Sequence, residues 1–147
     1  MPTIVKNAQI NDIKPELLVS LIFVESSFNY WAVSHAGACG LTQVLPKYTG
    51  KITKKYTCEQ LKVPRNSIYV GAKTLRFWIN HHDDISRGLC GYNAGFRCSY
   101  RRNKKGKIVK RPNKYGMRYA RKVQRISKRI LNESIRIKRE RHEEQGR

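Results

Sequence analysis

The chain has 147 residues, of which 39% are hydrophobic, and a formal net charge of +21. This length suits one domain with one core, and the longest apolar runs, such as residues 21–24, are too short to cross a bilayer. Residues 97–147 hold 20 of the 31 Lys and Arg residues but only 4 of the 10 Asp and Glu residues. Such a charge favours polyanionic partners, namely nucleic acid, an anionic membrane surface or a cell-wall polymer, without choosing among them.

The first predicted helix covers residues 15–27 and carries a carboxyl group in an unusual position. Pro15 suits the first helical position, and Asp12 is expected to cap the helix. Apolar residues recur along it at helical spacing, and Glu25 falls four residues after Leu21, on or beside that apolar face. Two interpretations stay open here. Glu25 is either a helix-end residue that reaches solvent or a carboxyl group held in an apolar setting for chemistry.

A loop rich in small residues follows this helix. Five of the residues from 34 to 40 are Ser, Ala or Gly, so the backbone can pass close to other groups or to a ligand. Leu41 and Val44 are expected to anchor the loop in the core, with the polar Gln43 between them. Pro46 is predicted to begin the next short element.

Two more helices are predicted before residue 96. The first covers about 67–81, is capped by Asn66 or Ser67, and has its two adjacent aromatic residues in the core. The second covers residues 85–94 and contains several small residues that favour close helix packing. It is expected to begin after an aspartate cap and to end at Gly95.

The basic C-terminal third is predicted to begin with a hairpin and to continue as a helix. A turn at Lys105-Gly106 fits a short β-hairpin near residues 99–111. A long helix is predicted from about Asn113, with an apolar stripe and basic residues on its other sides. Little is left to bury beyond residue 130, so residues 131–147 are expected to form a basic helical extension that frays at its C-terminal end.

Four cysteines stand at positions 39, 58, 90 and 98. Their spacing matches no zinc motif, and no metal site is expected. In an oxidising compartment they allow two disulfides in three connectivities, and bridged and free thiols both stay open. Cys39 and Cys90 each lie in a candidate active-site motif, so we expect them to be near each other.

Three separated motifs and one late tyrosine follow one another along the chain. They are Glu25-Ser26-x-Phe28, then Ser34-x-x-Gly37-Ala38-x-Gly40-Leu41-x-Gln43-x-x-Pro46, then Tyr92-Asn93-Ala94-Gly95, and finally Tyr119. Together they resemble the soluble-type (SLT) lytic transglycosylases of family 1, whose fold is similar to that of goose-type lysozyme. The resemblance covers about residues 10–125. It implies a mainly α, lysozyme-like single domain, which we expect to cover residues 1–130. The small size, the basicity and the absent signal peptide favour a phage-type enzyme.

The resemblance also implies roles for particular residues. Glu25 matches the family's single catalytic acid and base. Ser34 matches a serine that contacts the substrate near the scissile bond, and Gln43 matches a residue that lines the sugar groove. Tyr92 and Asn93 match residues that hold the catalytic glutamate and the substrate.

Tyr119 matches the late tyrosine on the last core helix of the family, but other positions depart from the family pattern. Thr42 stands where the family usually has methionine, and Cys90-Gly91 replaces two alanines. Both departures are expected to alter the fit of the saccharide. A glutamate often found shortly before the late tyrosine is absent, with Tyr115-Gly116 in its place, which is expected to change the electrostatics of the groove.

The sequence offers no convincing second catalytic carboxyl group, whereas ordinary glycosidases use two. The other acidic residues before residue 130 lie outside the motifs; they are Asp12, Glu16, Glu59, Asp83 and Asp84. Together with this single carboxyl group, the resemblance implies cleavage of the MurNAc-β-1,4-GlcNAc bond without water. In that hypothesis the acetamido group of the substrate would stabilise C1, and Glu25 would accept the proton of the C6 hydroxyl as a 1,6-anhydroMurNAc ring closes. Burial would raise the pKa of Glu25, as a general acid requires.

The resemblance implies peptidoglycan glycan strands as the substrate and no cofactor. Two interpretations of the basic residues 97–147 stay open: the solvated outer face of an amphipathic helix, or attachment to an anionic wall or membrane surface, with nucleic acid a less favoured partner. A monomer acting at the bacterial cell wall or periplasm is expected, delivered by a phage particle or a holin because residues 1–14 show no signal peptide. The alternatives are a lysozyme-type hydrolase of the same bond and a non-enzymatic basic virion, wall- or DNA-binding protein on the same scaffold.

Overall fold

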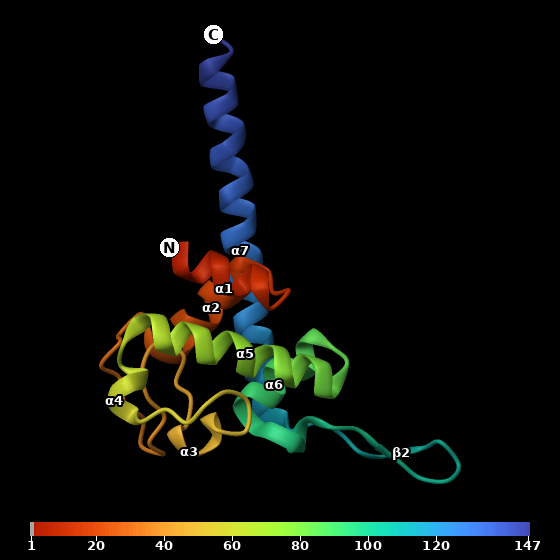
Figure 1. The fold of residues 1–147 in the computed structure, drawn as a ribbon. Coiled ribbons are helices and arrows are strands. Elements are labelled where there is room, and N and C mark those ends of the chain that lie inside the picture. Colours follow the sequence, from red (N-terminus) through yellow and green to blue (C-terminus); the bar gives the residue numbers. More distant parts are fainter. Residues whose placement is uncertain (1) are drawn as a thin grey trace.

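The computed structural model describes residues 2–147 and is mainly helical, with one two-stranded antiparallel sheet (Figure 1). In chain order the elements are α1 (Pro2–Ile10), α2 (Pro15–Ser26), α3 (Pro46–Thr49), α4 (Cys58–Leu61), α5 (Pro64–His82), α6 (Ile85–Ala94), the 3-10 helix η1 (Gly95–Cys98), β1 (Arg101–Arg102), β2 (Ile108–Lys110) and α7 (Lys114–Gln145). The mainly α architecture predicted from the sequence is therefore confirmed.

One hydrophobic core joins α1, α2, α5, α6 and α7. The apolar face of α2 lies at its centre, because Leu18, Leu21 and Ile22 are fully buried. They belong to the same cluster as Leu75 of α5 and Leu89 of α6. This packing fixes α2 along its length and places its C-terminal end, which carries Glu25, beside α7.

The N-terminal helix α1 was not predicted, because it gives the core only Ile4 and Ala8 and shows little apolar periodicity. The turn from α1 to α2 is held by Arg76 of α5. Its guanidinium donates to backbone carbonyl oxygens of this turn and forms an ion pair with Asp12 at 3.6 Å. Asp12 therefore does not cap α2, whose N-terminus has no side-chain cap, and that prediction is wrong. Pro15 does occupy the first turn, as predicted.

Helix α5 begins at Pro64, earlier than predicted, and has no side-chain cap. The expected caps are used elsewhere. Asn66 donates to the carbonyl oxygen of Gln60 at 3.0 Å, and the buried Ser67 hydroxyl accepts from the backbone N–H of Thr42 at 3.0 Å. A proline at the first position already fixes the helical φ angle there, so these two side chains are free to bind neighbouring segments.

The adjacent aromatic residues of α5 are less buried than predicted. Phe77 is 39% exposed, so its assignment to the core is wrong. Its ring packs edge-on against that of Trp78 at 5.0 Å. Trp78 is partly buried and contacts Phe96 of η1, also at 5.0 Å. Together with His81 and Phe96, the two residues form a surface aromatic cluster at the end of α5.

Asp84 caps α6 as predicted, because its carboxylate accepts from the backbone N–H groups of Ser86 and Arg87.

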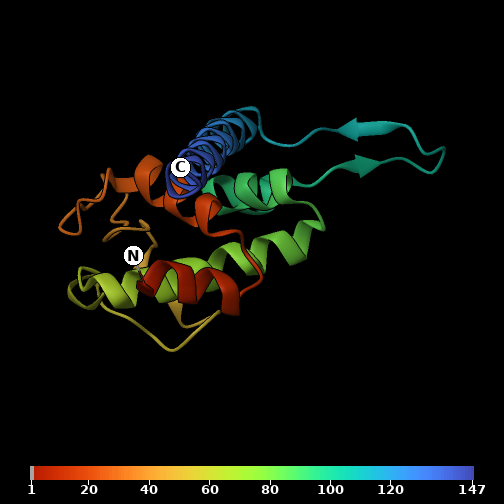
Figure 2. The same cartoon turned by 90° about the horizontal axis from the view of Figure 1, so that it is seen from above.

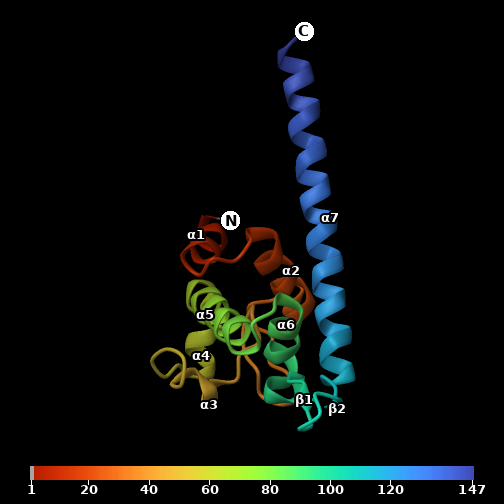
Figure 3. The same cartoon turned by 90° about the vertical axis from the view of Figure 1, so that its right-hand side faces the viewer.

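The hairpin and the long helix predicted for the basic C-terminal third are confirmed. β1 and β2 form the predicted hairpin, with Arg101 opposite Lys110. The side chain of Asn113 caps α7, which is helical to Gln145 and extends beyond the body of the molecule (Figure 3). Every residue from 131 onward is exposed; the domain boundary at residue 130 stays a prediction.

All four cysteines are bridged, as Cys39–Cys58 and Cys90–Cys98. Cys39 and Cys90 thus bond to different partners and lie in separate clusters of buried residues; their expected proximity stays a prediction. Within residues 2–147 we find neither a helix long and apolar enough to cross a membrane nor a group of three potential metal ligands.

Candidate active site

Glu25 occupies the last turn of α2, where the helix stops abruptly. Ser27 and Phe28 have φ angles of 50° and 63°, a left-handed conformation that ends a helix. The hydroxyl of Ser26 donates to the carbonyl oxygen of Leu41 at 2.8 Å and thereby joins the helix end to the glycine-rich loop. The carboxyl group of Glu25 is partly buried at this junction.

Tyr119 of α7 holds the Glu25 carboxyl group directly. Its phenol donates to Oε1 of Glu25 at 2.6 Å. Burial raises the pKa of Glu25 from 4.5 to about 7, and the hydrogen bond from Tyr119 partly offsets that rise. Burial also raises the pKa of Tyr119 well above its usual value, so the phenol remains a donor. The pair can therefore keep a protonated carboxyl group at neutral pH and still stabilise the carboxylate formed after proton transfer.

Tyr92 lies near Glu25 but binds the loop. Its phenol donates to the backbone carbonyl of Thr42 at 2.7 Å. Burial raises the pKa of Tyr92 well above its usual value, and the charge of Glu25 adds to the rise. The structure thus assigns Tyr119 to the Glu25 carboxyl group, whereas the resemblance had implied that Tyr92 and Asn93 hold it. The side chain of Asn93 is exposed and makes no hydrogen bond within the described residues.

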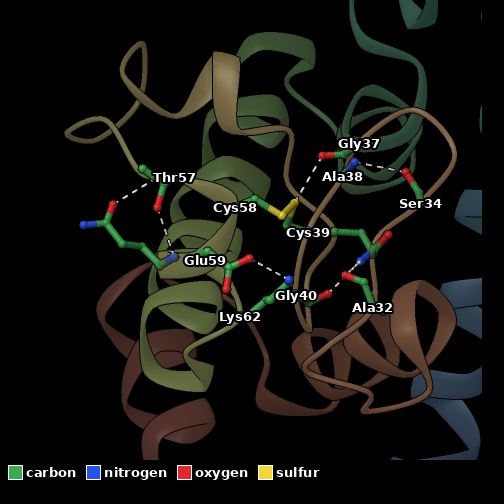
Figure 4. The surroundings of a disulfide bond; sticks show 12 residues. Ala32, Ser34, Gly37, Ala38, Cys39, Gly40, Thr57, Cys58, Glu59 and Lys62 are labelled. Atoms are coloured by element: carbon green, nitrogen blue, oxygen red, sulfur yellow. Dashed lines mark hydrogen bonds and ion pairs between the residues drawn. A yellow bond between two sulfur atoms is a disulfide. The ribbon is translucent and has the colours of Figure 1, made fainter.

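Gln43 stabilises the loop from within. Its backbone has a φ angle of 51°, and its side-chain amide donates to the carbonyl oxygens of Ala32 and Gly40, at 3.0 and 2.9 Å. Ser34, which is exposed, accepts from the backbone N–H of Ala38 at 3.0 Å (Figure 4). Both side chains therefore shape the loop, and Ser34 remains accessible to a ligand.

The Cys39–Cys58 disulfide ties the loop to α4 (Figure 4). Thr57 and Gln60 form a reciprocal capping box at the start of this short helix, which fixes the position of Cys58. Cys39 is also paired with Val33 and Val44 in isolated β-bridges. The loop is thus held at its centre by covalent and backbone bonds.

A buried contact between this loop and α5 was not predicted from the sequence. Thr42 is fully buried, and its hydroxyl donates to the carbonyl oxygen of Ser67 at 2.8 Å. A Cβ added to Gly71 would lie 2.4 Å from Cγ2 of Thr42, so this close approach requires glycine. The side chains of Thr42 and Cys90 are fully buried, so an effect on the fit of the saccharide would act through the position of the loop and of α6; that expectation stays a prediction.

Among the described residues, no second carboxyl group forms a hydrogen bond with Glu25 or contributes to its raised pKa. Glu16 belongs to the first turn of the same helix. There it lines a hollow of about 820 Å³ with Arg76 and Leu131, at the opposite end of α2 from Glu25. The candidate site therefore contains one carboxyl group and two phenols.

The family model of the transglycosylase SLT domain matches residues 2–114, which is most of the chain. The chain belongs to this family. It is 33% identical over 110 residues to the membrane-bound lytic murein transglycosylase C of Haemophilus ducreyi, covering 65% of this chain and 30% of that protein. It is 34% identical over 92 residues to a transglycosylase of Enterobacteria phage PRD1, covering 60% and 32%.

Two solved structures support the SLT fold. The lytic transglycosylase Slt of Pseudomonas aeruginosa, solved as an inactive mutant, aligns with a TM-score of 0.69 over 86% of this chain and 23% of its own, at 22% identity. The 70 kDa soluble lytic transglycosylase of Escherichia coli aligns with a TM-score of 0.59 over 64% and 16%, also at 22% identity. The chain spans about a third or less of the length of these relatives.

Proposed function

We propose that this chain is a peptidoglycan lytic transglycosylase that cleaves the MurNAc-β-1,4-GlcNAc bond without water and forms 1,6-anhydroMurNAc. The observation that carries the proposal is a lone, partly buried Glu25 with a pKa near 7, hydrogen-bonded by Tyr119. The relative from H. ducreyi is named for the cleavage of murein, which supports the same substrate here.

In the first step Glu25 acts as a general acid. Its protonated carboxyl group donates to the glycosidic oxygen, the bond from that oxygen to C1 of MurNAc breaks, and the GlcNAc residue leaves with a free 4-hydroxyl. A pKa of about 7 keeps a large fraction of Glu25 protonated at neutral pH. The acetamido group of MurNAc supplies the electrons that stabilise C1, since no second carboxyl group is found beside Glu25 among residues 2–147.

In the second step Glu25 acts as a general base. Now a carboxylate, it removes the proton from the C6 hydroxyl of MurNAc, and that oxygen attacks C1 and displaces the acetamido oxygen. The 1,6-anhydro ring closes, Glu25 regains its proton, and no water is consumed. Tyr119 donates its hydrogen bond to the carboxylate between the two steps, which stabilises the charge at that stage.

We assign the remaining residues to binding and positioning. Ser34 and Asn93, whose side chains are exposed, are proposed to contact the glycan. Gln43 and Tyr92 are proposed to line or support the groove through the loop contacts that they make. Tyr119 is proposed to orient Glu25. No metal or cofactor takes part in this scheme.

Digestion of purified sacculi followed by mass analysis of the muropeptide ends tests the proposal. The expected products carry anhydro ends, which are one water lighter than hydrolytic ends. Hydrated reducing ends alone would instead identify a lysozyme-type hydrolase. Absence of any cleavage by the folded protein would favour a non-enzymatic binding protein on the same scaffold.

Glu25→Gln is the matched variant, because it keeps the side-chain volume and removes the titrating group. It should lower turnover by at least about a hundredfold while the protein stays folded. Lysis of sacculi by this variant at the wild-type rate would contradict the role of Glu25.

We further propose that a monomer acts at the bacterial cell wall or periplasm, and that the basic surface within residues 97–147 attracts an anionic wall or membrane. The PRD1 relative supports delivery in the course of a phage infection, by a virion or through a holin.

A further inference from the structure

Most of the net positive charge of this chain lies in one stretch without acidic residues. Residues 85–132 contain 16 of the 31 Lys and Arg residues and no Asp or Glu. The structure folds most of this stretch into the β1–β2 hairpin and the first half of α7. The hairpin projects sideways from the body and leads directly into α7 (Figure 2), so the two basic segments adjoin.

The basic residues of α7 point away from the core. At about 100° per residue they fall within an arc of about 120° around the helix, opposite the buried Gly116, Ala120 and Val123. They are Lys114, Arg118, Arg121, Lys122, Arg125, Lys128 and Arg129. We define this stripe together with residues 96–111 as the basic face.

Apolar side chains are exposed among these cations. Phe96 is 65% exposed and Val109 is 50% exposed, and neither side chain can form a hydrogen bond. Tyr100 and Tyr115 are 45% and 70% exposed. Aromatic and aliphatic groups interspersed with Lys and Arg are typical of surfaces that dock at the headgroup region of a membrane.

The projecting end of α7 differs from the basic face. Residues 131–147 contain five Lys and Arg residues and four Asp and Glu residues. Some of these charges pair within the helix, since Arg136 forms ion pairs with Glu133 and Glu140. The electrostatic attraction of an anionic surface that is expected of residues 97–147 therefore comes from the hairpin and the first half of α7, and not from the helical extension.

We propose that the basic face docks on the anionic headgroups of a lipid bilayer, with Phe96 and Val109 entering the interface. Its cations match the negative surface potential of such a membrane, and its exposed apolar groups favour a bilayer over nucleic acid or a soluble wall polymer. Docking would hold the enzyme at the membrane from which it reaches the wall. Binding of the basic face to lipid does not depend on the proposed cleavage of the glycan. Only the biological purpose of the docking rests on that proposed function.

Sedimentation of the full chain with lipid vesicles tests this docking. Vesicles of phosphatidylcholine with about one third phosphatidylglycerol should bind the protein at low salt and release it as salt rises toward 0.5 M or so. Vesicles of pure phosphatidylcholine should bind it weakly. Each cation at such a surface strengthens binding roughly fivefold.

A charge variant and a matched control locate the binding surface. Replacing the hairpin residues Lys104, Lys105, Lys107 and Lys110 by Gln should weaken binding to the anionic vesicles by at least about a hundredfold. Replacing Lys47, Lys51, Lys54 and Lys55 by Gln removes the same number of exposed charges on and after α3. That control should weaken binding only a few-fold, because those lysines lie outside the basic face.

Val109→Thr separates the membrane from other polyanions. It keeps the β-branched shape and removes apolar surface, so vesicle binding should weaken roughly threefold while binding to duplex DNA should not change. Equal losses for the two lysine variants would overturn the proposal. So would salt-dependent binding to duplex DNA or sacculi without binding to the vesicles. Turnover of a soluble glycan fragment, measured in parallel, reports on the proposed activity separately.

Discussion

Glu25 is held in an environment that disfavours its charged form. Burial next to the apolar face of α2 raises its pKa to about 7, and Tyr119 supplies the main compensating interaction. The unfolded chain exposes the same carboxyl group to water, where its pKa is 4.5. The difference between the two states links the catalytic role of this residue to the stability of the fold.

Glu25→Gln should stabilise the protein at alkaline pH. Because the pKa of Glu25 is higher in the folded state, its contribution to stability is fully present below pH 4.5 and is lost as pH rises through about 7. The glutamine does not titrate. The free energy of unfolding of the variant should therefore match the wild type near pH 4 and exceed it by on the order of 3 kcal/mol near pH 8.

Urea denaturation at the two pH values measures this difference. Glu16→Gln, at the other end of α2, is the control for loss of one negative charge from the same helix. An equal gain at alkaline pH in both variants would show that the effect arises from net charge and not from burial of Glu25.

Tyr119→Phe should move the alkaline limit of activity upward. The phenol stabilises the carboxylate of Glu25, so its loss raises the pKa of that group further. Wild-type activity should fall above about pH 7, where Glu25 loses its proton, and the variant should retain the protonated acid to higher pH. Its maximal rate should be roughly tenfold lower, because the carboxylate loses its hydrogen bond.

The measurement is the pH dependence of kcat/KM on a soluble glycan fragment. A lower rate with an unshifted alkaline limb would mean that Tyr119 has only a structural role.

At the scale of elements, the loop between α2 and α3 contains little regular structure, and its shape comes from contacts with neighbouring elements. Ser26 joins it to α2, Thr42 joins it to α5, and Tyr92 joins it to α6. The Cys39–Cys58 disulfide joins it to α4. This many constraints preorganise a loop that would otherwise lose considerable conformational entropy on binding a glycan.

Replacing both Cys39 and Cys58 by Ser should test how far that order depends on the disulfide. The bridge spans a sequence separation of 19 residues, and its loss should lower the free energy of unfolding by about 3 kcal/mol. Because Gln43 and Ser34 lie in the loop, KM should rise more than kcat falls. Chemical denaturation and steady-state kinetics provide the two readouts. Wild-type values in both would show that hydrogen bonds alone fix the loop.

At the scale of the whole molecule, the body and the projecting end of α7 have different roles. Residues 132–147 are exposed throughout, and a helical segment without tertiary contacts adds little to the stability of the rest. The catalytic groups and the basic face both lie before residue 130.

Removal of residues 133–147 should therefore leave the fold and the chemistry intact. The shortened chain keeps Leu131, which lines the hollow beside α2. Its free energy of unfolding should change by less than about 0.5 kcal/mol, and its turnover of a soluble glycan fragment should equal that of the full chain. A large loss of stability, measured by thermal unfolding, would place the domain boundary beyond residue 130.

The family and most of the helices follow from patterns that are visible in the amino-acid sequence. The periodicity of α2, the aspartate before α6, the Lys105-Gly106 turn and the Asn113 cap are local signals, because neighbours within a few residues create them. The motifs that carry Glu25 and Tyr119 were also recognisable in the sequence.

The contacts among these residues arise from tertiary packing and could not be predicted from local patterns. α1 is stabilised by packing and not by its own pattern, and Asp12 and Ser67 bind distant segments instead of capping their helices. The choice of Tyr119 as the partner of Glu25, 94 positions away in the chain, and the pairing of the cysteines are long-range contacts. Such contacts depend on which faces pack together, and no local propensity encodes them.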